Sequence, residues 1–248
     1  ILMNNSESMS VFNSGKYIII SLKNEIISPE EIYYDLNSII QEININQDIW
    51  VVGFDLTKVE KICDIKSSAE SLNISLTKLI LEIKKPVIGL VSGEISNRLF
   101  EMILPMDYRI TDKKSTFIMS QIFNDNMQFD GATQLLPRII GLNKSKELIM
   151  FGKQINSKEA SEIGLVNIIV DEEKLNETFI CKIELLTQFS PLAMQFTKSA
   201  INFSKDTNTI RGMNMENDLY SILLSSKDRT SSINSIKNKS KRNPYSGK

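Results

Sequence analysis

Few side chains in this chain are suited to proton transfer, because its 248 residues include no histidine. No Ser-His-Asp or Cys-His arrangement can form, and the commonest zinc ligand and general base near neutral pH is missing. Proton transfer would therefore fall to carboxylates, lysine, tyrosine or backbone amides. Arg98 and Glu101 lie three residues apart, so in a helix they share one face, where the guanidinium can neutralise the carboxylate. Glu101 is thus a candidate acid/base or one half of a structural ion pair.

Arg98 has two further interpretations. A guanidinium pairs bidentately with a carboxylate, so Arg98 could recognise a substrate carboxylate, as a decarboxylating lyase would need. It could equally be an exposed arginine at the surface or at a subunit interface. No metal site is predicted, because Cys63 and Cys181 lack metal-type spacing and the sequence contains no EF-hand, Walker or dinucleotide-binding loop.

The composition is that of a globular protein. With 42% hydrophobic residues and a formal net charge of -1, the chain can bury a substantial core and has no global attraction to anionic polymers. No apolar run approaches the roughly 20 residues that span a bilayer, and residues 1–15 lack the pattern of a secretory signal. Two distant cysteines suit a reducing compartment, so we expect free thiols and a cytoplasmic location. The basic residues 237–242 could contact phosphate groups, either those of RNA or those of a phosphorylated small molecule.

The elements that must position these groups alternate between strand and helix. Apolar, β-branched runs predict strands covered on both faces over residues 17–22, 50–56 and 87–92. Ser28-Pro29-Glu30-Glu31 predicts a helix start with a capping box, and the apolar residues of 72–83 repeat at helical spacing. This alternation predicts a parallel α/β layer. From residue 171 onward the chain is almost wholly helical, with Ser190-Pro191 opening one helix.

One long stretch, residues 84–166, carries a family resemblance. Its phrases are KPVIGLVSG at 85–93, ISNRLFEM at 95–102, DYRI at 107–110, GATQLLPR at 131–138 and GLV at 164–166. In this order and spacing they resemble the crotonase (enoyl-CoA hydratase/isomerase) family, and the resemblance extends from about Tyr17 to the tail. It implies a crotonase-like α/β spiral of ββα units with a C-terminal helical region.

The resemblance implies a site that stabilises an oxyanion. In this family an acyl-CoA thioester places its carbonyl oxygen between two backbone N–H groups, which stabilise an enolate. The matching donor positions are Cys63, next to Asp64, and Arg98, in a stretch where Asn97-Arg98-Leu99 replaces three glycines. Every residue except proline supplies an N–H, but the larger side chains should crowd the thioester.

The resemblance also assigns the acids. Hydratases of this family use two glutamates to activate one water, and the matching positions are Glu101 and Gln121. Gln121 can hydrogen-bond a water but cannot transfer its proton, so ordinary hydration should be crippled. Asp125 and Asp130 could supply a relocated acid, although aspartate at such positions more often forms a turn. Lys198 matches a family phrase and is expected to contact CoA.

We therefore expect a crotonase-like core over residues 1–190 and a helical assembly region with a basic tail over residues 191–248. The resemblance implies a homotrimer or a dimer of trimers, without a membrane or nucleic acid as partner. One candidate function is a lyase or isomerase acting on an acyl-CoA or acyl-carrier thioester, with no cofactor besides that substrate. The alternative is a catalytically degraded paralogue that binds a partner or assembles with an active subunit. The filled glycine positions favour the alternative.

Overall fold

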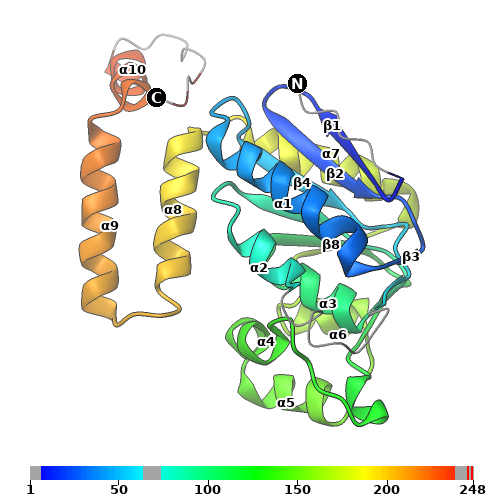
Figure 1. Ribbon diagram of the computed structural model, residues 1–248. Coiled ribbons are helices and arrows are strands. Elements are labelled where there is room, and N and C mark those ends of the chain that lie inside the picture. Colours follow the sequence, from blue (N-terminus) through cyan, green and yellow to red (C-terminus); the bar gives the residue numbers. More distant parts are fainter. Residues whose placement is uncertain (1–6, 64–73, 238–244, 246, 248) are drawn as a thin grey trace.

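The computed structural model describes residues 7–63, 74–237, 245 and 247. Its architecture repeats one unit, two strands followed by a helix (Figure 1). In the described ranges the unit occurs as β2–β3–α1, β4–β5–α2, β6–β7–α3 and β8–β9–α4. The first strand of each unit joins one large sheet and the second joins a smaller sheet. The structure therefore has the predicted spiral of ββα units.

The large sheet has six strands, in the order β1-β2-β4-β6-β8-β11. They are β1 (Met9–Asn13), β2 (Tyr17–Leu22), β4 (Val51–Asp55), β6 (Val87–Leu90), β8 (Tyr108–Asp112) and β11 (Ile168–Val170). β1 pairs antiparallel with β2, and the other pairs are parallel. Every residue of β6 is buried, as expected for a strand with both faces covered. The predicted parallel layer is confirmed.

Two smaller sheets lie beside it. One pairs β3 (Ile26–Ile27) with β5 (Lys61–Ile62), and the other has the order β10-β9-β7. Its strands are β7 (Glu94–Ser96), β9 (Thr116–Ile118) and β10 (Ile155–Asn156). β7 runs directly into α3, so the β7–β9 pairing fixes where that helix begins.

Helices cover both faces of the large sheet. α1 (Pro29–Ile45), α2 (Leu76–Leu81) and α3 (Asn97–Ile103) contribute side chains to the larger apolar core. α7 (Leu175–Leu186) covers the opposite face with Leu175, Phe179 and Ile183. It packs so closely on β4 that a methyl group at Gly53 would lie 2.7 Å from both Phe179 Cζ and Ile183 Cδ1.

The first helix begins where predicted but without the predicted capping box. Ser28 is the N-cap of α1, with Pro29 in the first turn, yet its side chain accepts no capping hydrogen bond. The Ser28 hydroxyl instead donates to Glu30 Oε2 over 2.5 Å, and this hydrogen bond lowers the Glu30 pKa. A capping box is present at α6 (Ser157–Glu162), where Asn156 and Glu159 bond reciprocally. The Ser28 hydroxyl thus bonds Glu30 instead of capping the helix, and the Glu31 N–H donates to the Ser28 carbonyl over 3.1 Å.

The remaining helices complete the chain. α4 (Ala132–Ile140), α5 (Leu142–Met150) and the short 3₁₀ helices η2 (Gln121–Asn124) and η3 (Glu172–Lys174) belong to the body, whereas α8 (Pro191–Phe203), α9 (Thr209–Leu224) and α10 (Lys227–Lys237) follow it. Figure 1 shows α8 and α9 side by side, with α9 on the side away from the sheet. None of the helices in the described ranges is both long and apolar enough to cross a bilayer.

Candidate active site

The amino end of α3 has an unusual backbone. β7 ends at Ser96 and the helix begins at Asn97, whose φ of 48° lies in the left-handed region. This region favours glycine, and asparagine is among the few other residues that tolerate it. Asn97 therefore adopts a glycine-like backbone conformation at a position where the resemblance places a glycine. Arg98 and Leu99 follow it and are buried.

Glu101, the first candidate acid, lies one turn further along α3 and is 1% exposed. Both carboxylate oxygens accept hydrogen bonds. The Asp130 N–H donates to Oε2 over 2.6 Å, and Gln121 Nε2 donates to Oε1 over 3.3 Å. Gln128 Nε2 in turn donates to Gln121 Oε1 over 3.2 Å. The two positions that resemble the hydratase acids are therefore adjacent and in direct contact.

Arg98 forms a buried ion pair with Asp130. Its Nε lies 3.8 Å from Asp130 Oδ2, and the two side chains are 3% and 1% exposed. The guanidinium also donates to the Ile74 carbonyl and lies 4.8 Å from the centre of the Phe129 ring. The interpretation of Arg98 as a surface arginine is therefore wrong, because its side chain is buried and paired with Asp130.

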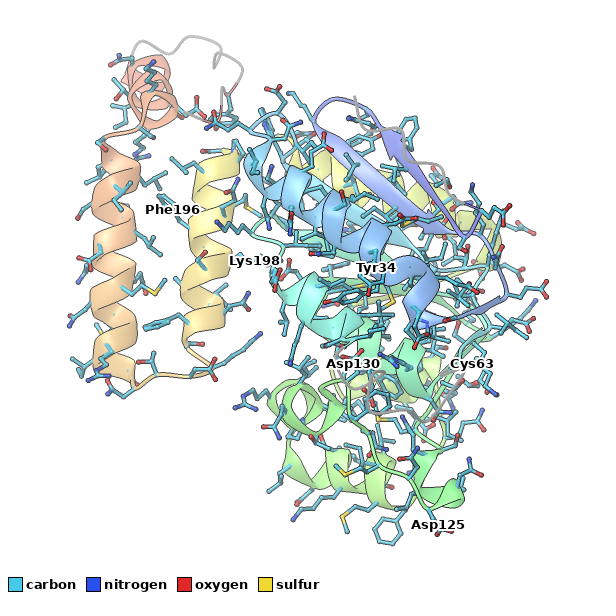
Figure 2. All side chains as sticks on the ribbon, in the orientation of Figure 1. Tyr34, Cys63, Asp125, Asp130, Phe196 and Lys198 are labelled. Carbon is cyan, nitrogen blue, oxygen red and sulfur yellow. The ribbon has the colours of Figure 1, made fainter. Side chains whose placement is uncertain are left out.

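Asp130 also organises the start of α2. Its carboxylate accepts from the Ser75 hydroxyl and from the Thr77 N–H. Burial raises the pKa of Asp130, and the Ser75 hydrogen bond and the Arg98 charge oppose that shift. Asp125, by contrast, is exposed and ends η2 with a φ of 53°. Figure 2 shows it at the outer edge of the molecule, away from Asp130.

The second expected oxyanion donor is engaged elsewhere. The Cys63 N–H donates to the Ile27 carbonyl over 2.9 Å, which continues the β3–β5 pairing by one residue. In this conformation the Cys63 N–H is already bonded to a backbone carbonyl. It could donate to a ligand only if this hydrogen bond opened. Asp64, predicted beside it, lies outside the described residues.

A polar cleft opens next to Asn97. It has a volume of about 570 Å³ and is lined by Thr57, Val59, Glu60, Lys61, Ser92, Gly93, Glu94, Ser96, Asn97 and Ser120. Thr57 and Ser92 follow the carboxyl ends of β4 and β6, the edge where parallel sheets commonly bind ligands. The described lining does not include Glu101, which is buried.

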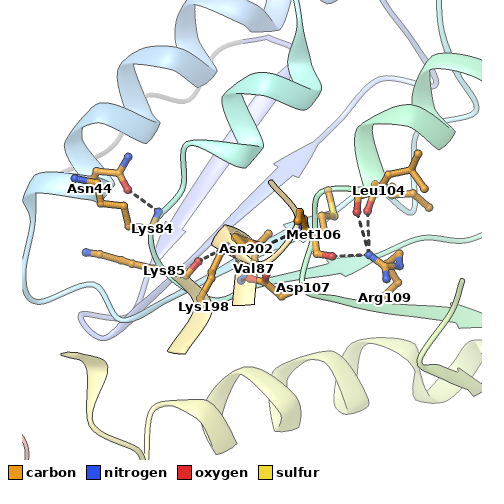
Figure 3. Close-up of polar contacts among 12 residues, drawn as sticks. Asn44, Lys84, Lys85, Val87, Leu104, Met106, Asp107, Arg109, Lys198 and Asn202 are labelled. Atoms are coloured by element: carbon orange, nitrogen blue, oxygen red, sulfur yellow. Dashed lines mark hydrogen bonds and ion pairs between the residues drawn. The ribbon is translucent and has the colours of Figure 1, made fainter. Parts of the chain in front are cut away.

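Lys198 of α8, the predicted CoA contact, is bonded within the protein. Its Nζ lies 2.7 Å from Asp107 Oδ2 and 2.8 Å from the Lys85 carbonyl, with the Lys198 side chain 10% exposed (Figure 3). Burial lowers the pKa of Lys198, and Asp107 opposes the shift. These contacts attach α8 to the body. A CoA contact by Lys198 stays a prediction.

Several contacts of the site were not predicted from the sequence. They are the hydrogen bonds between Asn97 and Ser120, the hydrogen bond from Gln128 to Gln121, the hydrogen bond from Ser75 to Asp130, and the ion pair of Arg98 with Asp130. Each joins residues from different elements, so local spacing gave no signal. Within the described ranges no group of three metal-binding side chains gathers.

The spiral of ββα units, with the buried Glu101 on the helix that follows β7, defines a crotonase fold. Comparison with known proteins gives the same class: the family model described as enoyl-CoA hydratase/isomerase matches residues 46–246. The chain belongs to this family.

Individual similar proteins belong to the same class by their names. A short-chain-enoyl-CoA hydratase of Clostridioides difficile is 32% identical over 154 residues, which is 62% of this chain and 99% of the relative. A crotonyl-CoA hydratase of Syntrophomonas wolfei is 28% identical, over 78% of this chain and 75% of the relative. The crystal structure of an enoyl-CoA hydratase from Bacillus anthracis superposes with a TM-score of 0.88 at 25% identity, covering 98% of this chain and 100% of that one.

Proposed function

We propose that this protein binds an acyl-CoA or acyl-carrier thioester and moves a proton within it, as an isomerase or lyase, and that it does not hydrate its substrate. The contact between Gln121 Nε2 and Glu101 Oε1, 3.3 Å long, carries the proposal. Hydration in this family needs two carboxylates with a water between them. Here the Gln121 and Glu101 side chains are in direct contact, and the Gln121 amide cannot act as a general acid or base. One acid/base remains.

A single carboxylate is sufficient for a 1,3-proton shift. Glu101 would accept a proton from C2 of a 3-enoyl thioester, and the resulting charge would spread onto the thioester oxygen. The same carboxyl group would then return the proton to C4, so that atoms and charge balance. The Arg98 N–H, near the start of α3, would stabilise the oxyanion. The names of the relatives, enoyl-CoA and crotonyl-CoA hydratases, support the thioester as substrate class.

The test is isomerisation of vinylacetyl-CoA to crotonyl-CoA, followed by the rise in conjugated-enoyl absorbance. Glu101→Gln keeps the size of the side chain and should lower the rate by roughly 100-fold or more, as loss of a general acid/base does. Asp125→Asn is the matched control, because asparagine tolerates the left-handed backbone there, and it should leave the rate unchanged. Equal rates for wild type and Glu101→Gln would refute the assignment.

One set of observations favours the alternative, a degraded paralogue. Both oxygens of Glu101 accept internal hydrogen bonds, the Cys63 N–H belongs to a strand pairing, and the Arg98 side chain lies in the interior. Calorimetric titration with crotonyl-CoA separates the two functions. Micromolar binding supports the enzyme, whereas no binding and no turnover support the paralogue.

We also propose that α8 and α9 mediate assembly into a homotrimer or a dimer of trimers. Large apolar side chains on these helices are exposed: Ile201, Ile210, Met213, Tyr220 and Ile222 are each more than half exposed in the single chain. Such a surface is typical of a subunit interface. Light scattering should give the mass of a trimer or of a dimer of trimers, and Ile222→Glu should lower it toward the mass of the monomer. A monomeric wild type would contradict this proposal.

A further inference from the structure

Two parallel links join the start of α3 to η2. The first is between Asn97 and Ser120, and the second is between Glu101 and Gln121. Asn97 and Glu101 are four residues apart and therefore lie on one face of the helix. Ser120 and Gln121 are consecutive. The first link thus lies one helical turn from the contact on which the proposed chemistry depends.

The Asn97–Ser120 link uses every polar atom of both side chains. Asn97 Oδ1 accepts the Ser120 N–H over 2.7 Å and the Ser120 hydroxyl over 3.1 Å, while Asn97 Nδ2 donates to Ser120 Oγ over 3.0 Å. The hydroxyl can donate once and accept once, so the three bonds are compatible. Both side chains also line the polar cleft, so the link forms part of the wall of the candidate site.

The link holds one backbone position that would otherwise be costly. Asn97 has a left-handed φ of 48°, a conformation that favours glycine. A non-glycine residue keeps such a conformation only when its surroundings determine it. The pairing of β7 with β9 ends at Ser96 and Ile118, so the link extends the connection between the two segments beyond the last strand pair.

From these contacts we propose that Asn97 is a positioning residue: through Ser120 it sets the position of Gln121 against Glu101. This inference rests on the proposed function, in which Glu101 is the acid/base. Misplacement of catalytic groups by about 1 Å can cost on the order of 100-fold in rate. Loss of the link should therefore lower kcat for vinylacetyl-CoA by about 10- to 100-fold and leave KM within about twofold.

Three substitutions separate the link from the backbone bend. Asn97→Gly permits the left-handed φ but removes the link, Asn97→Ala removes both, and Asn97→Asp keeps an acceptor for the Ser120 N–H and tolerates the bend. We expect low kcat for Gly and Ala and recovery for Asp. Wild-type kcat in Asn97→Gly would overturn the proposal, because only the bend would then matter.

A measurement without substrate keeps this test independent of the proposed function. The Gln121 side-chain amide gives ¹H–¹⁵N NMR signals, which the Gln121→Glu variant identifies. These signals should move in Asn97→Gly and Asn97→Ala and return toward wild type in Asn97→Asp. If wild type lacks activity, the proposed function fails, while the NMR signals still decide the link. Unchanged Gln121 signals in all three folded variants would overturn the positioning role.

Discussion

Replacing Arg98 by methionine tests the buried ion pair between Arg98 and Asp130. Methionine fits the same space but leaves the Asp130 carboxylate, 1% exposed, without the cation 3.8 Å away. Removing one partner of a buried ion pair costs about 3–5 kcal/mol. Because this pair is long and Asp130 keeps its bonds from Ser75 and Thr77, we expect the lower end, about 3 kcal/mol.

Urea denaturation followed by circular dichroism measures this change. With a slope of about 3 kcal/mol per molar urea, the midpoint should fall by about 1 M. The double variant Arg98→Met/Asp130→Asn removes the uncompensated charge and should be more stable than Arg98→Met alone, since neutralising both partners avoids the penalty. A loss below about 0.5 kcal/mol, the level of ordinary surface substitutions, would refute the buried-pair argument. A double variant that loses as much unfolding free energy as Arg98→Met and Asp130→Asn lose together would also refute it.

Three further predictions concern the core and α8. Burial lowers the pKa of Lys85 from its ordinary 10.5 to about 8. Between these two pH values the unfolded chain binds one more proton than the folded protein, so the free energy of unfolding should rise with pH. Urea titrations at several pH values should show this rise in the wild type and a flatter dependence in Lys85→Met. Lys198→Met should destabilise the protein by about 1–3 kcal/mol through loss of the Asp107 contact. A tenfold weaker crotonyl-CoA affinity in this variant would support the predicted CoA contact, and an unchanged affinity would contradict it. Gly53→Ala should cost about 1–3 kcal/mol by overpacking against Phe179, and an unchanged melting temperature would contradict the close approach of α7.

The fold was largely predictable from the sequence because its signals are local. The apolar run of β2 and the Ser190-Pro191 start of α8 appear as expected. β4 and β6 begin or end within two residues of the predicted limits. The Ser28 capping box was wrong because the Glu31 N–H donates to the Ser28 carbonyl over 3.1 Å and the Ser28 hydroxyl donates to Glu30, and the sequence pattern cannot show either choice of partner.

The site was predictable only in part, because its bonds join distant segments. Spacing on one helix suggested that Arg98 would meet Glu101, but the ion pair that the structure shows joins Arg98 to Asp130, 32 residues away. A desolvated carboxylate requires a cation, and no local pattern predicts which one reaches it. Asn97 was expected to crowd the site as a glycine replacement, whereas its side chain bonds Ser120. The contact between Asn97 and Ser120 joins segments that are distant in the sequence, so it becomes visible only in the structure.

The central claim is that one carboxylate moves a proton and no water is added. Proton NMR of the wild-type protein with vinylacetyl-CoA tests both parts in one sample. We predict that crotonyl-CoA appears, that its formation is lost in Glu101→Gln, and that no 3-hydroxybutyryl-CoA forms. Accumulation of 3-hydroxybutyryl-CoA by the wild-type protein would contradict the account.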